Sequence, residues 1–405
     1  MPRSCHAVRF RTFTLCIALA VISALVLAAC GGGDDEAGTA GDGIPEGPIV
    51  IGAAVAESGV LEAYDSGPLN AVKAAVADIN ADGGIDGHDL EVVVSDTTSD
   101  PARGGSAALD VIAQDAVVVV VSCDFDYGSG AAQAAASKGV LAISTCGASD
   151  KFNPDVLGPL VFTMANRAQD EGTVMAQWAY EEKGLRRAYL LENNSLSYGA
   201  DKCAGMRDAF PQYEGAEIAG QATYKEGETR FAAQISNIRS TNADFIFICD
   251  GTDGGIPAVK QIRAAGIDAA ILGGASWDGD YWVDAVPNLS DFYFATYGSV
   301  FGDDPRESIN DLLAQIEEET GRKPVTSFDL TGYALGEAVG LAIERSGSVE
   351  GEILSEELEK FDEEPLILGP TTFTDTKHIT PLRPMTIIEI QNGEPSFLEL
   401  YPSDA

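Results

Sequence analysis

From Pro48 onward, short apolar runs alternate with segments whose apolar positions recur at helical spacing. The apolar runs predict strands at residues 49–55, 90–95, 117–122, 140–144, 160–164, 188–192, 216–223, 245–249, 270–272 and 292–296. The segments 69–80, 102–114 and 130–138 fit one face of a helix. Helices at about 306–320 and 327–346, and late strands near 371–373 and 385–390, complete the pattern.

The run at 117–121 consists of valine alone, so it is apolar on both faces, as a strand inside a parallel sheet must be. Repeated strand–helix units predict parallel α/β sheets with right-handed crossovers. So many strands exceed one small sheet, and the chain is long for a single core. We therefore expect two doubly wound parallel-sheet lobes.

The first residues have a different pattern. Basic residues precede an uncharged run at 12–29, which is typical of a secretory signal. The run could also span a membrane, but acidic rather than basic residues follow it, at 34–36. Leu27-Ala28-Ala29-Cys30 is similar to the lipobox of bacterial lipoproteins, which implies a signal peptide at 1–29 and a lipid on Cys30. Residues 30–47, rich in Gly and acid, predict a flexible tether. An ordinary cleaved signal is the alternative.

The charge of the chain excludes some partners. It carries 63 Asp and Glu against 25 Lys and Arg, a net charge of −38. Without residues 1–29 the net charge is −41, because three arginines and no acid are lost. Such acidity disfavours nucleic acid and anionic membrane surfaces as partners. A solubilising surface accounts for it more simply than an acidic binding site does.

Four of the seven cysteines follow the predicted anchor, and an even set in an exported chain predicts disulfides. These are Cys123, Cys146, Cys203 and Cys249. They allow three connectivities. Cys123 and Cys146 end two strands expected to be neighbours in one sheet, which favours a bridge between them and leaves Cys203 with Cys249.

Catalytic chemistry finds little support. His88 and His378 are the histidines beyond the predicted signal, which disfavours Ser-His-Asp, Cys-His and zinc sites. No P-loop or nucleophile elbow is present, and the glycines at 41–47 precede the first strand instead of following it. We expect no enzyme activity, no metal and no cofactor, with a surface hydrolase as the remaining enzymatic alternative.

Loops that follow the strands carry the candidate ligand chemistry, because doubly wound sheets bind ligands beyond their carboxyl edges, where strand order reverses. The candidates are Tyr64, Phe125, Asp126, Tyr127, Ser149, Tyr198, Asp250, Trp277 and Asp278. Aromatic rings beside carboxylates suit a cationic group on an apolar body. Ser149 and free loop N–H groups would bind an acceptor group. Each aspartate could instead cap a helix.

Several stretches together resemble the type I periplasmic binding proteins of the leucine/isoleucine/valine-binding family, over about residues 48–394. They are Ile51-Gly-Ala-Ala-Val-Ala-Glu-Ser-Gly59 and the segments 71–85, 139–144, 198–199 and 368–370. The resemblance implies two lobes joined by three crossings, near 165–168, 296–299 and 373–378. The N-terminal lobe would hold 48–166 plus 298–372, and the C-terminal lobe 167–297 plus 373–402.

The resemblance also implies site residues. Tyr64 and Tyr198 fall where the family places pocket tyrosines, and Ser149 falls near its ammonium-binding Thr or Ser. The position of the family's carboxylate-anchoring serine holds Phe125, and its ammonium-binding glutamate has no clear match near Trp277. These departures argue against a standard branched-chain amino acid as the ligand.

The function implied is a monomeric, lipid-anchored solute receptor outside the cell membrane. It would capture a small amino-acid-like or cationic or amide solute between its lobes and deliver it to an ABC permease with its ATPase subunits. A sensor of the same fold, which signals to a membrane partner, is the alternative.

Overall fold

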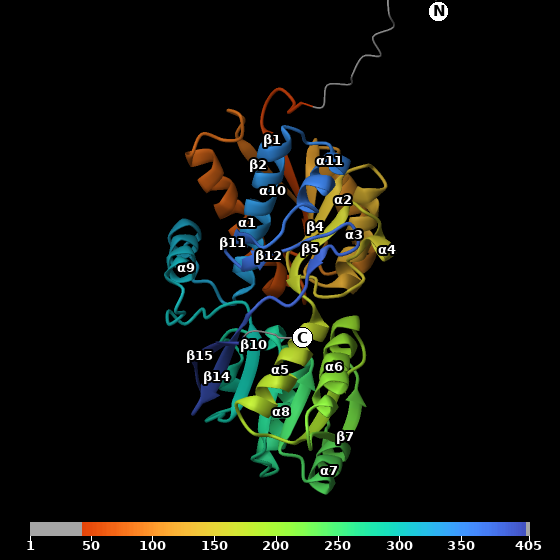
Figure 1. The fold of residues 1–405 in the computed structure, drawn as a ribbon, viewed down its shortest axis with the longest axis vertical. Helices are drawn as coiled ribbons and strands as arrows, with labels where there is room; N and C mark the ends of the chain where they lie inside the picture. Colours follow the sequence, from red (N-terminus) through yellow and green to blue (C-terminus); the bar gives the residue numbers. More distant parts are fainter. Residues whose placement is uncertain (1–42, 402–405) are drawn as a thin grey trace, which may run out of the picture. The chain divides into compact units, whose positions relative to one another are not determined.

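The computed structural model describes residues 43–401, without the side chains of residues 252 and 253. The predicted signal peptide, Cys30 and most of the tether lie outside the described residues. The described chain forms two lobes, each built on one large sheet with helices packed against it (Figure 1).

The first sheet has six strands in the order β13-β5-β4-β3-β1-β2, all parallel. Their bounds are β1 Ile49–Val55, β2 Leu90–Asp96, β3 Ala116–Val121, β4 Leu141–Ser144, β5 Val161–Asn166 and β13 Ile379–Thr380. In β3, Val118 and Val120 pack into one apolar cluster and Val119 and Val121 into another, so both faces of the strand are buried as predicted. The first cluster contains side chains of α1, α9, α10 and α11, and the second contains those of α2 and α3.

The helices of this lobe are α1 Glu62–Ala81, α2 Gly104–Ile112, α3 Phe125–Ala136, α4 Pro154–Leu157, α9 Glu307–Thr320, α10 Phe328–Ser346 and α11 Gly351–Leu358. A short 3₁₀ turn, Pro101–Arg103, precedes α2, and a hairpin of β11 Glu364–Leu366 and β12 Gly369–Thr371 follows α11. Two helices begin earlier than predicted, α1 at Glu62 and α3 at Phe125. Their first turns therefore carry residues that the sequence assigned to loops.

The second sheet has seven strands in the order β15-β14-β10-β9-β8-β6-β7. Its strands are β6 Arg187–Asn193, β7 Glu217–Tyr224, β8 Phe245–Cys249, β9 Ala270–Gly273, β10 Phe292–Thr296, β14 Met385–Gln391 and β15 Glu394–Tyr401. Its helices are α5 Ala168–Glu181, α6 Ser197–Ala209, α7 Ala232–Thr241 and α8 Thr252–Ala264, with 3₁₀ turns at Phe210–Gln212, Ala275–Trp277 and Val283–Ala285.

One edge of the second sheet departs from the predicted parallel order. β14 pairs antiparallel with β10, and β15 pairs antiparallel with β14. Asn392 and Gly393 join these two strands with φ values of 54° and 83°, the conformation that an Asn-Gly hairpin turn requires. β15 is absent from the predicted strands, although this turn signal precedes it.

Three segments pass between the lobes, because the chain changes sheet after β5, after β10 and after β13. Ile379 pairs with Thr163 of β5, so β13 belongs to the first sheet. The third crossing therefore lies between Thr380 and Met385, and its predicted position at 373–378 is wrong. The buried Arg383 guanidinium fixes this segment by donating to the Met164 carbonyl and to Asn166 Oδ1, both at 3.1 Å.

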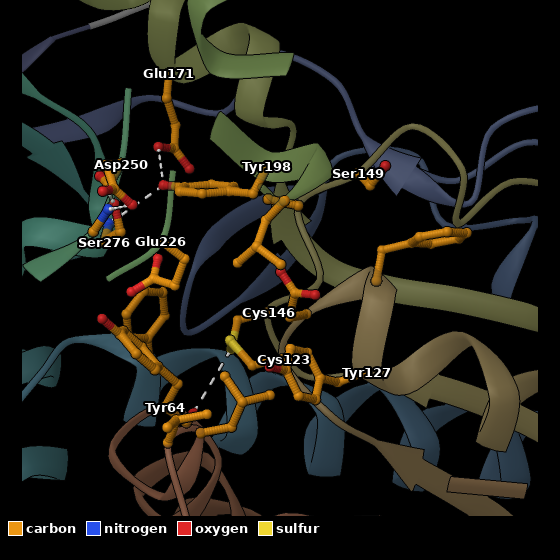
Figure 2. Close-up of a pocket in the computed structure, with 18 of the residues that line it drawn as sticks. Tyr64, Cys123, Tyr127, Cys146, Ser149, Glu171, Tyr198, Glu226, Asp250 and Ser276 are labelled. Carbon is orange, nitrogen blue, oxygen red and sulfur yellow. Dashed lines mark hydrogen bonds between the residues drawn. A yellow bond between two sulfur atoms is a disulfide. The ribbon is translucent and has the colours of Figure 1, made fainter. Parts of the chain in front are cut away.

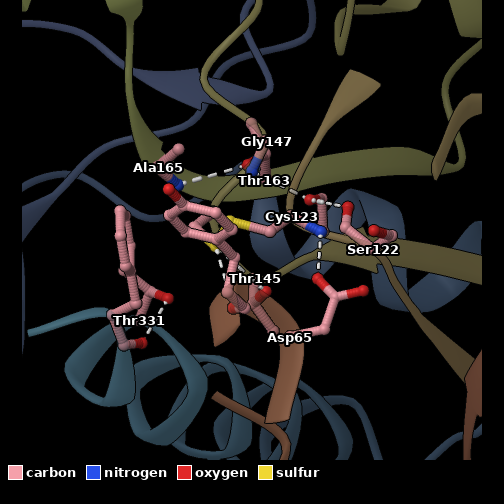
Figure 3. Close-up of a disulfide and its surroundings, with 12 residues drawn as sticks. Asp65, Ser122, Cys123, Thr145, Gly147, Thr163, Ala165 and Thr331 are labelled. Atoms are coloured by element: carbon pink, nitrogen blue, oxygen red, sulfur yellow. Dashed lines mark hydrogen bonds between the residues drawn. A yellow bond between two sulfur atoms is a disulfide. The ribbon is translucent and has the colours of Figure 1, made fainter. Parts of the chain in front are cut away.

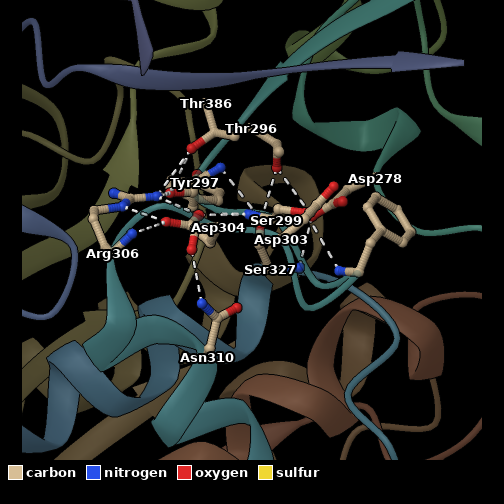
Figure 4. Close-up of polar contacts among 11 residues, drawn as sticks. Asp278, Thr296, Tyr297, Ser299, Asp303, Asp304, Arg306, Asn310, Ser327 and Thr386 are labelled. Carbon is tan, nitrogen blue, oxygen red and sulfur yellow. Dashed lines mark hydrogen bonds and ion pairs between the residues drawn. The ribbon is translucent and has the colours of Figure 1, made fainter. Parts of the chain in front are cut away.

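A polar cluster surrounds the second crossing, which follows β10 (Figure 4). Asp278, which follows the Ala275–Trp277 turn of the second lobe, accepts a hydrogen bond from the Ser327 backbone N–H at 2.6 Å and another from Thr296 Oγ1 at 3.0 Å. Ser327 precedes α10 of the first lobe, so the hydrogen bonds of Asp278 connect the two lobes.

Among the described residues, no helix is both long enough and apolar enough to cross a bilayer.

Candidate functional site

A cavity of about 260 Å³ lies where loops from both sheets meet (Figure 2). Its lining from the first lobe is Val60, Leu61, Tyr64, Cys123, Asp124, Phe125, Tyr127, Cys146, Ala148, Ser149 and Phe328. Its lining from the second lobe and the second crossing is Glu171, Leu196, Tyr198, Glu226, Asp250, Gly251, Ser276 and Tyr297. Nearly all of these residues follow the carboxyl end of a strand.

The position of the cavity follows from the strand orders. Strand order reverses between β1 and β3 in the first sheet and between β6 and β8 in the second. Chains leaving neighbouring strands in opposite directions open a crevice at such a point. The loops after all four of these strands line the cavity, so it occupies both crevices at once.

Aromatic rings form much of the first-lobe wall. The Tyr64 and Phe328 rings lie edge to face with centroids 5.9 Å apart, and Tyr297 meets Phe328 in the same way at 5.6 Å. Phe125 rests edge-on against the buried Phe152 ring at 5.4 Å. These contacts hold the rings in place, which gives the cavity a preformed apolar surface.

A charged network supports the second-lobe wall. Tyr198 donates its hydroxyl to Glu171 Oε2 at 2.7 Å, and Lys202 Nζ donates to the Asp250 carbonyl and to Ser276 Oγ, both at 2.9 Å. Burial raises the pKa of Glu171, which the nearby Lys202 ammonium opposes. Burial lowers the pKa of Lys202 to about 8, which Glu171 and Asp250 oppose in turn. Lys202 is fully buried and lies outside the lining, so its ammonium group interacts with these residues and not with the cavity.

Asp250 itself is held by the second lobe. Tyr224 donates its hydroxyl to one carboxylate oxygen, and the Gly251 backbone N–H donates to the other at 2.7 Å. Burial raises the pKa of Asp250 above its usual value, and burial together with this carboxylate raises that of Tyr224.

Two aspartates organise the first-lobe loops. Asp65 of α1 accepts hydrogen bonds from the backbone N–H groups of Ala56 and Cys123, both at 2.8 Å, and burial raises its pKa to about 6. Asp124 caps α3 by accepting from the Asp126 N–H at 2.8 Å. Burial and then the neighbouring Asp126 carboxylate raise the pKa of Asp124 to about 6.

The structure contains the predicted Cys123–Cys146 disulfide, whose Cα atoms are 4.4 Å apart (Figure 3). It joins the loops after β3 and β4, and both of its residues line the cavity. Cys203 and Cys249 form the second disulfide, with Cα atoms 5.4 Å apart, inside the core of the second lobe.

Six of the nine predicted ligand residues line the cavity. They are Tyr64, Phe125, Tyr127, Ser149, Tyr198 and Asp250. Asp126 lies outside the lining and is exposed, and it accepts a hydrogen bond from the Ser197 N–H at the start of α6 at 3.0 Å. It therefore caps a helix of the opposite lobe.

Trp277 and Asp278 also lie outside the lining. Trp277 is fully buried against Trp282 and Phe292, with ring centroids 5.0 Å away in both cases. The rings of Trp277 and Trp282 therefore belong to the core of the second lobe and not to the cavity wall. Burial raises the pKa of Asp278 to about 6, and its oxygens are engaged at the crossing.

Other lining residues were missed. Asp124 stands in a loop that the sequence singled out, and its spacing before a helix is a capping signal. Glu171 and Phe328 lie in helices that follow a crossing or a long loop, and Glu226 is exposed on the loop after β7. The rule that ligands bind beyond strand ends also selects Glu226, which follows β7, whereas no local pattern in the sequence places Glu171 and Phe328 beside these loops. The described residues contain no cluster of His, Cys, Asp and Glu suited to a metal ion.

Two α/β lobes that share a cavity at their strand-order reversals define a two-lobed solute-binding protein. The Periplasmic binding protein family model matches residues 48–395, and the chain belongs to this family. Its relatives and structural neighbours include Leu/Ile/Val-binding proteins of the type I class.

Individual relatives are distant but cover most of the chain. The Leu/Ile/Val-binding protein BraC3 of Rhizobium johnstonii is 24% identical over 339 residues, which cover 82% of this chain and 89% of the relative. The branched-chain amino acid transporter substrate-binding protein LivJ of Streptococcus pneumoniae, solved with isoleucine, matches with a TM-score of 0.77 and 24% identity, over 88% of this chain and 99% of its own. A solute-binding protein of an R. palustris ABC transporter, solved with 4-hydroxybenzoate, matches with a TM-score of 0.76 and 17% identity, over 88% and 98%.

Proposed function

We propose that this chain is the extracytoplasmic solute receptor of an ABC importer, anchored to the membrane by a lipid on Cys30, and that it is not an enzyme. The observation that carries the proposal is the cavity whose walls come from both lobes. A solute held there contacts both walls only when the lobes are together, so it favours the closed form through its higher affinity for that form.

The proposed ligand is a small amino-acid-like, cationic or amide-bearing solute. The residues proposed to contact it are those of the predicted set that line the cavity, with Glu171, Glu226, Ser276 and Phe328 added. The ligands of the two solved neighbours, isoleucine and 4-hydroxybenzoate, differ in charge and shape, so the fold alone does not choose between such solutes.

Native mass spectrometry of the full-length protein, purified in detergent, tests this function. We expect one bound small molecule per chain, released by gentle denaturation. The same spectrum tests the anchor, because lipid on Cys30 adds a diacylglyceryl mass that Cys30→Ser abolishes. A protein that stays empty, and that a panel of amines, amino acids and carboxylic acids also fails to stabilise against heat, would contradict the receptor function.

A further inference from the structure

Five N–H groups in the loops around the cavity are already bound by the protein's own carboxylates. Asp65 accepts from Ala56 and Cys123 at 2.8 Å, and Asp124 accepts from Asp126 at the same distance. On the other lobe, Asp250 accepts from Gly251 at 2.7 Å and Glu171 Oε2 accepts from Ala275 at 3.0 Å. Backbone donors at strand ends and helix starts are the groups that would bind a ligand carboxylate. Here internal acids occupy that role, so the expectation that free loop N–H groups bind an acceptor is wrong at these positions.

The charges of the lining point the same way. Asp124, Glu171, Glu226 and Asp250 line the cavity, and among the described lining residues none is Lys, Arg or His. Lys202 lies behind the second-lobe wall, and its ammonium is engaged by Tyr198, Ser276 and the Asp250 carbonyl. Lys151 lies over the Phe125 ring, 5.0 Å from its centroid, and donates to Ser197 Oγ at 2.7 Å. A ligand carboxylate would meet acids on both walls without a matching cation in the lining, which is unfavourable in a partly buried site.

Acids of opposite lobes, Asp124 and Glu226, line the same cavity as the Tyr127 ring. Burial and then the carboxylates of Asp124, Glu226 and Asp126 raise the pKa of Tyr127. Asp124 follows β3 of the first lobe and Glu226 follows β7 of the second. When no cation lies between them, bringing the lobes together places like charges near each other, which opposes closure.

We infer, on the basis of the proposed function, that the ligand is an organic cation with an apolar body and without a carboxylate group, whose charge lies near Tyr127 between Asp124 and Glu226. The Tyr127 ring face and the two acids suit an ammonium group. Phe125, Tyr64 and Phe328 supply the apolar surface for the rest of the solute. The cation removes the repulsion between the lobes, so its charge both selects the ligand and permits closure.

Matched sets of solutes that share one apolar side chain test this inference. One set is 2-phenylethylamine, phenylalanine and 3-phenylpropionate, and another is 3-methylbutylamine, leucine and 4-methylpentanoate. Each is titrated calorimetrically into the purified full-length protein, together with a quaternary analogue of the first amine. We expect at least one amine to bind, and to bind at least tenfold more tightly than the zwitterion and the acid of its set.

Glu226→Gln removes one of the two acids at an exposed position, so the fold should be retained. We expect it to weaken amine binding about tenfold, whereas Glu214→Gln, the same change at an exposed position outside the lining, should leave it unchanged.

Four outcomes would overturn the inference. A zwitterion or acid that binds as tightly as the amine of its set would do so while leaving the receptor function intact. Equal amine affinity in Glu226→Gln and the native protein would show that the ligand's charge does not lie beside Glu226. No binding by any amine, with an acid or amino acid released in the mass spectrum, would also reject a cationic ligand. Failure of every solute class together with an empty spectrum would reject the receptor function as well.

Discussion

Two groups of aromatic side chains in this protein have similar sequence surroundings but different positions. In the second lobe, Trp277, Trp282 and Phe292 pack against one another in the core. In the cavity, the rings of Phe125, Tyr127, Phe328 and their neighbours pack on one side and face the cavity on the other. Both groups lie in or beside segments that follow strands.

The difference lies in what the backbone beside each ring allows. A Cβ atom at Gly255 or Gly273 would lie 2.3 Å from the Trp277 ring, so these glycines make room for it in the core. Phe125 stands in the first turn of α3, where one face of the helix packs inward and the other meets the cavity. An aromatic residue after a strand therefore indicates a ligand site only when no small residues receive its ring.

The largest effect that separates the two groups is on stability. Trp277→Ala should lower the free energy of unfolding by about 3–5 kcal/mol, because it empties a fully buried site that neighbouring backbone cannot fill. Urea unfolding measures this change. Tyr127→Ala, in the cavity, should cost less than about 1 kcal/mol. If Trp277→Ala kept near-native stability but bound the ligand more weakly, Trp277 would be a ligand-contacting residue and not a core residue.

Much of the fold could be predicted from the sequence, because the central parallel strands are buried on both faces and appear as continuous apolar runs. β3 and β8 are examples that need no tertiary information. β15 was missed because its residues alternate weakly, and it is stabilised by pairing with β14. The third crossing was misplaced because β13 is only two residues long and is defined by its pairing with β5.

The candidate site was predictable only in part, for a similar reason. Residues directly after strands, such as Tyr198 and Asp250, follow from the topological rule. Glu171 and Phe328 reach the cavity because the crossings bring their helices beside the strand ends. Whether a loop acid faces a ligand or binds a backbone N–H, as Asp65 does, depends on the folded geometry.

A second test compares the buried aspartates that follow an aromatic residue in each group, Asp278 after Trp277 and Asp329 after Phe328. Asp278 accepts several hydrogen bonds, whereas Asp329 lies against Gly67, and burial raises its pKa to about 7. Its folded pKa exceeds the ordinary value of 3.8, so the folded state binds more protons than the unfolded state and loses stability as the pH rises from about 4 to 7.

Asp329→Asn should therefore flatten the decline in stability between pH 4 and 7. The carboxylate accounts for a loss on the order of 3 kcal/mol across that window. Urea unfolding of both proteins at several pH values measures the difference. Asp208→Asn, at an exposed position in α6, is the matched control and should leave the slope unchanged. A slope that survives in Asp329→Asn would mean that this carboxyl is ionised in the folded protein.

A third test concerns affinity alone. Phe125→Ala should weaken binding of the tightest solute about tenfold, because it removes one ring face from the cavity while its inner partner Phe152 stays buried. Calorimetric titration measures the affinity. Leu109→Ala, an exposed apolar position in the same lobe, should not alter it. Unchanged affinity in Phe125→Ala would exclude this ring from ligand contact.

The smallest expected effect is at Asp126, which stands between the cavity residues Phe125 and Tyr127 in the sequence but lies outside the lining. It distinguishes a contact with the ligand from a contact between the lobes. Because Asp126 caps α6 of the opposite lobe, Asp126→Ala should weaken binding only about fivefold, the equivalent of one helix cap of about 1 kcal/mol. The loss should be the same for cationic and uncharged solutes, since it acts on the closed form. A direct contact with the ligand's cation would instead weaken cations selectively, and the effect would shrink as salt is added. Titrations of an amine and its uncharged amide analogue at two salt concentrations separate the two roles.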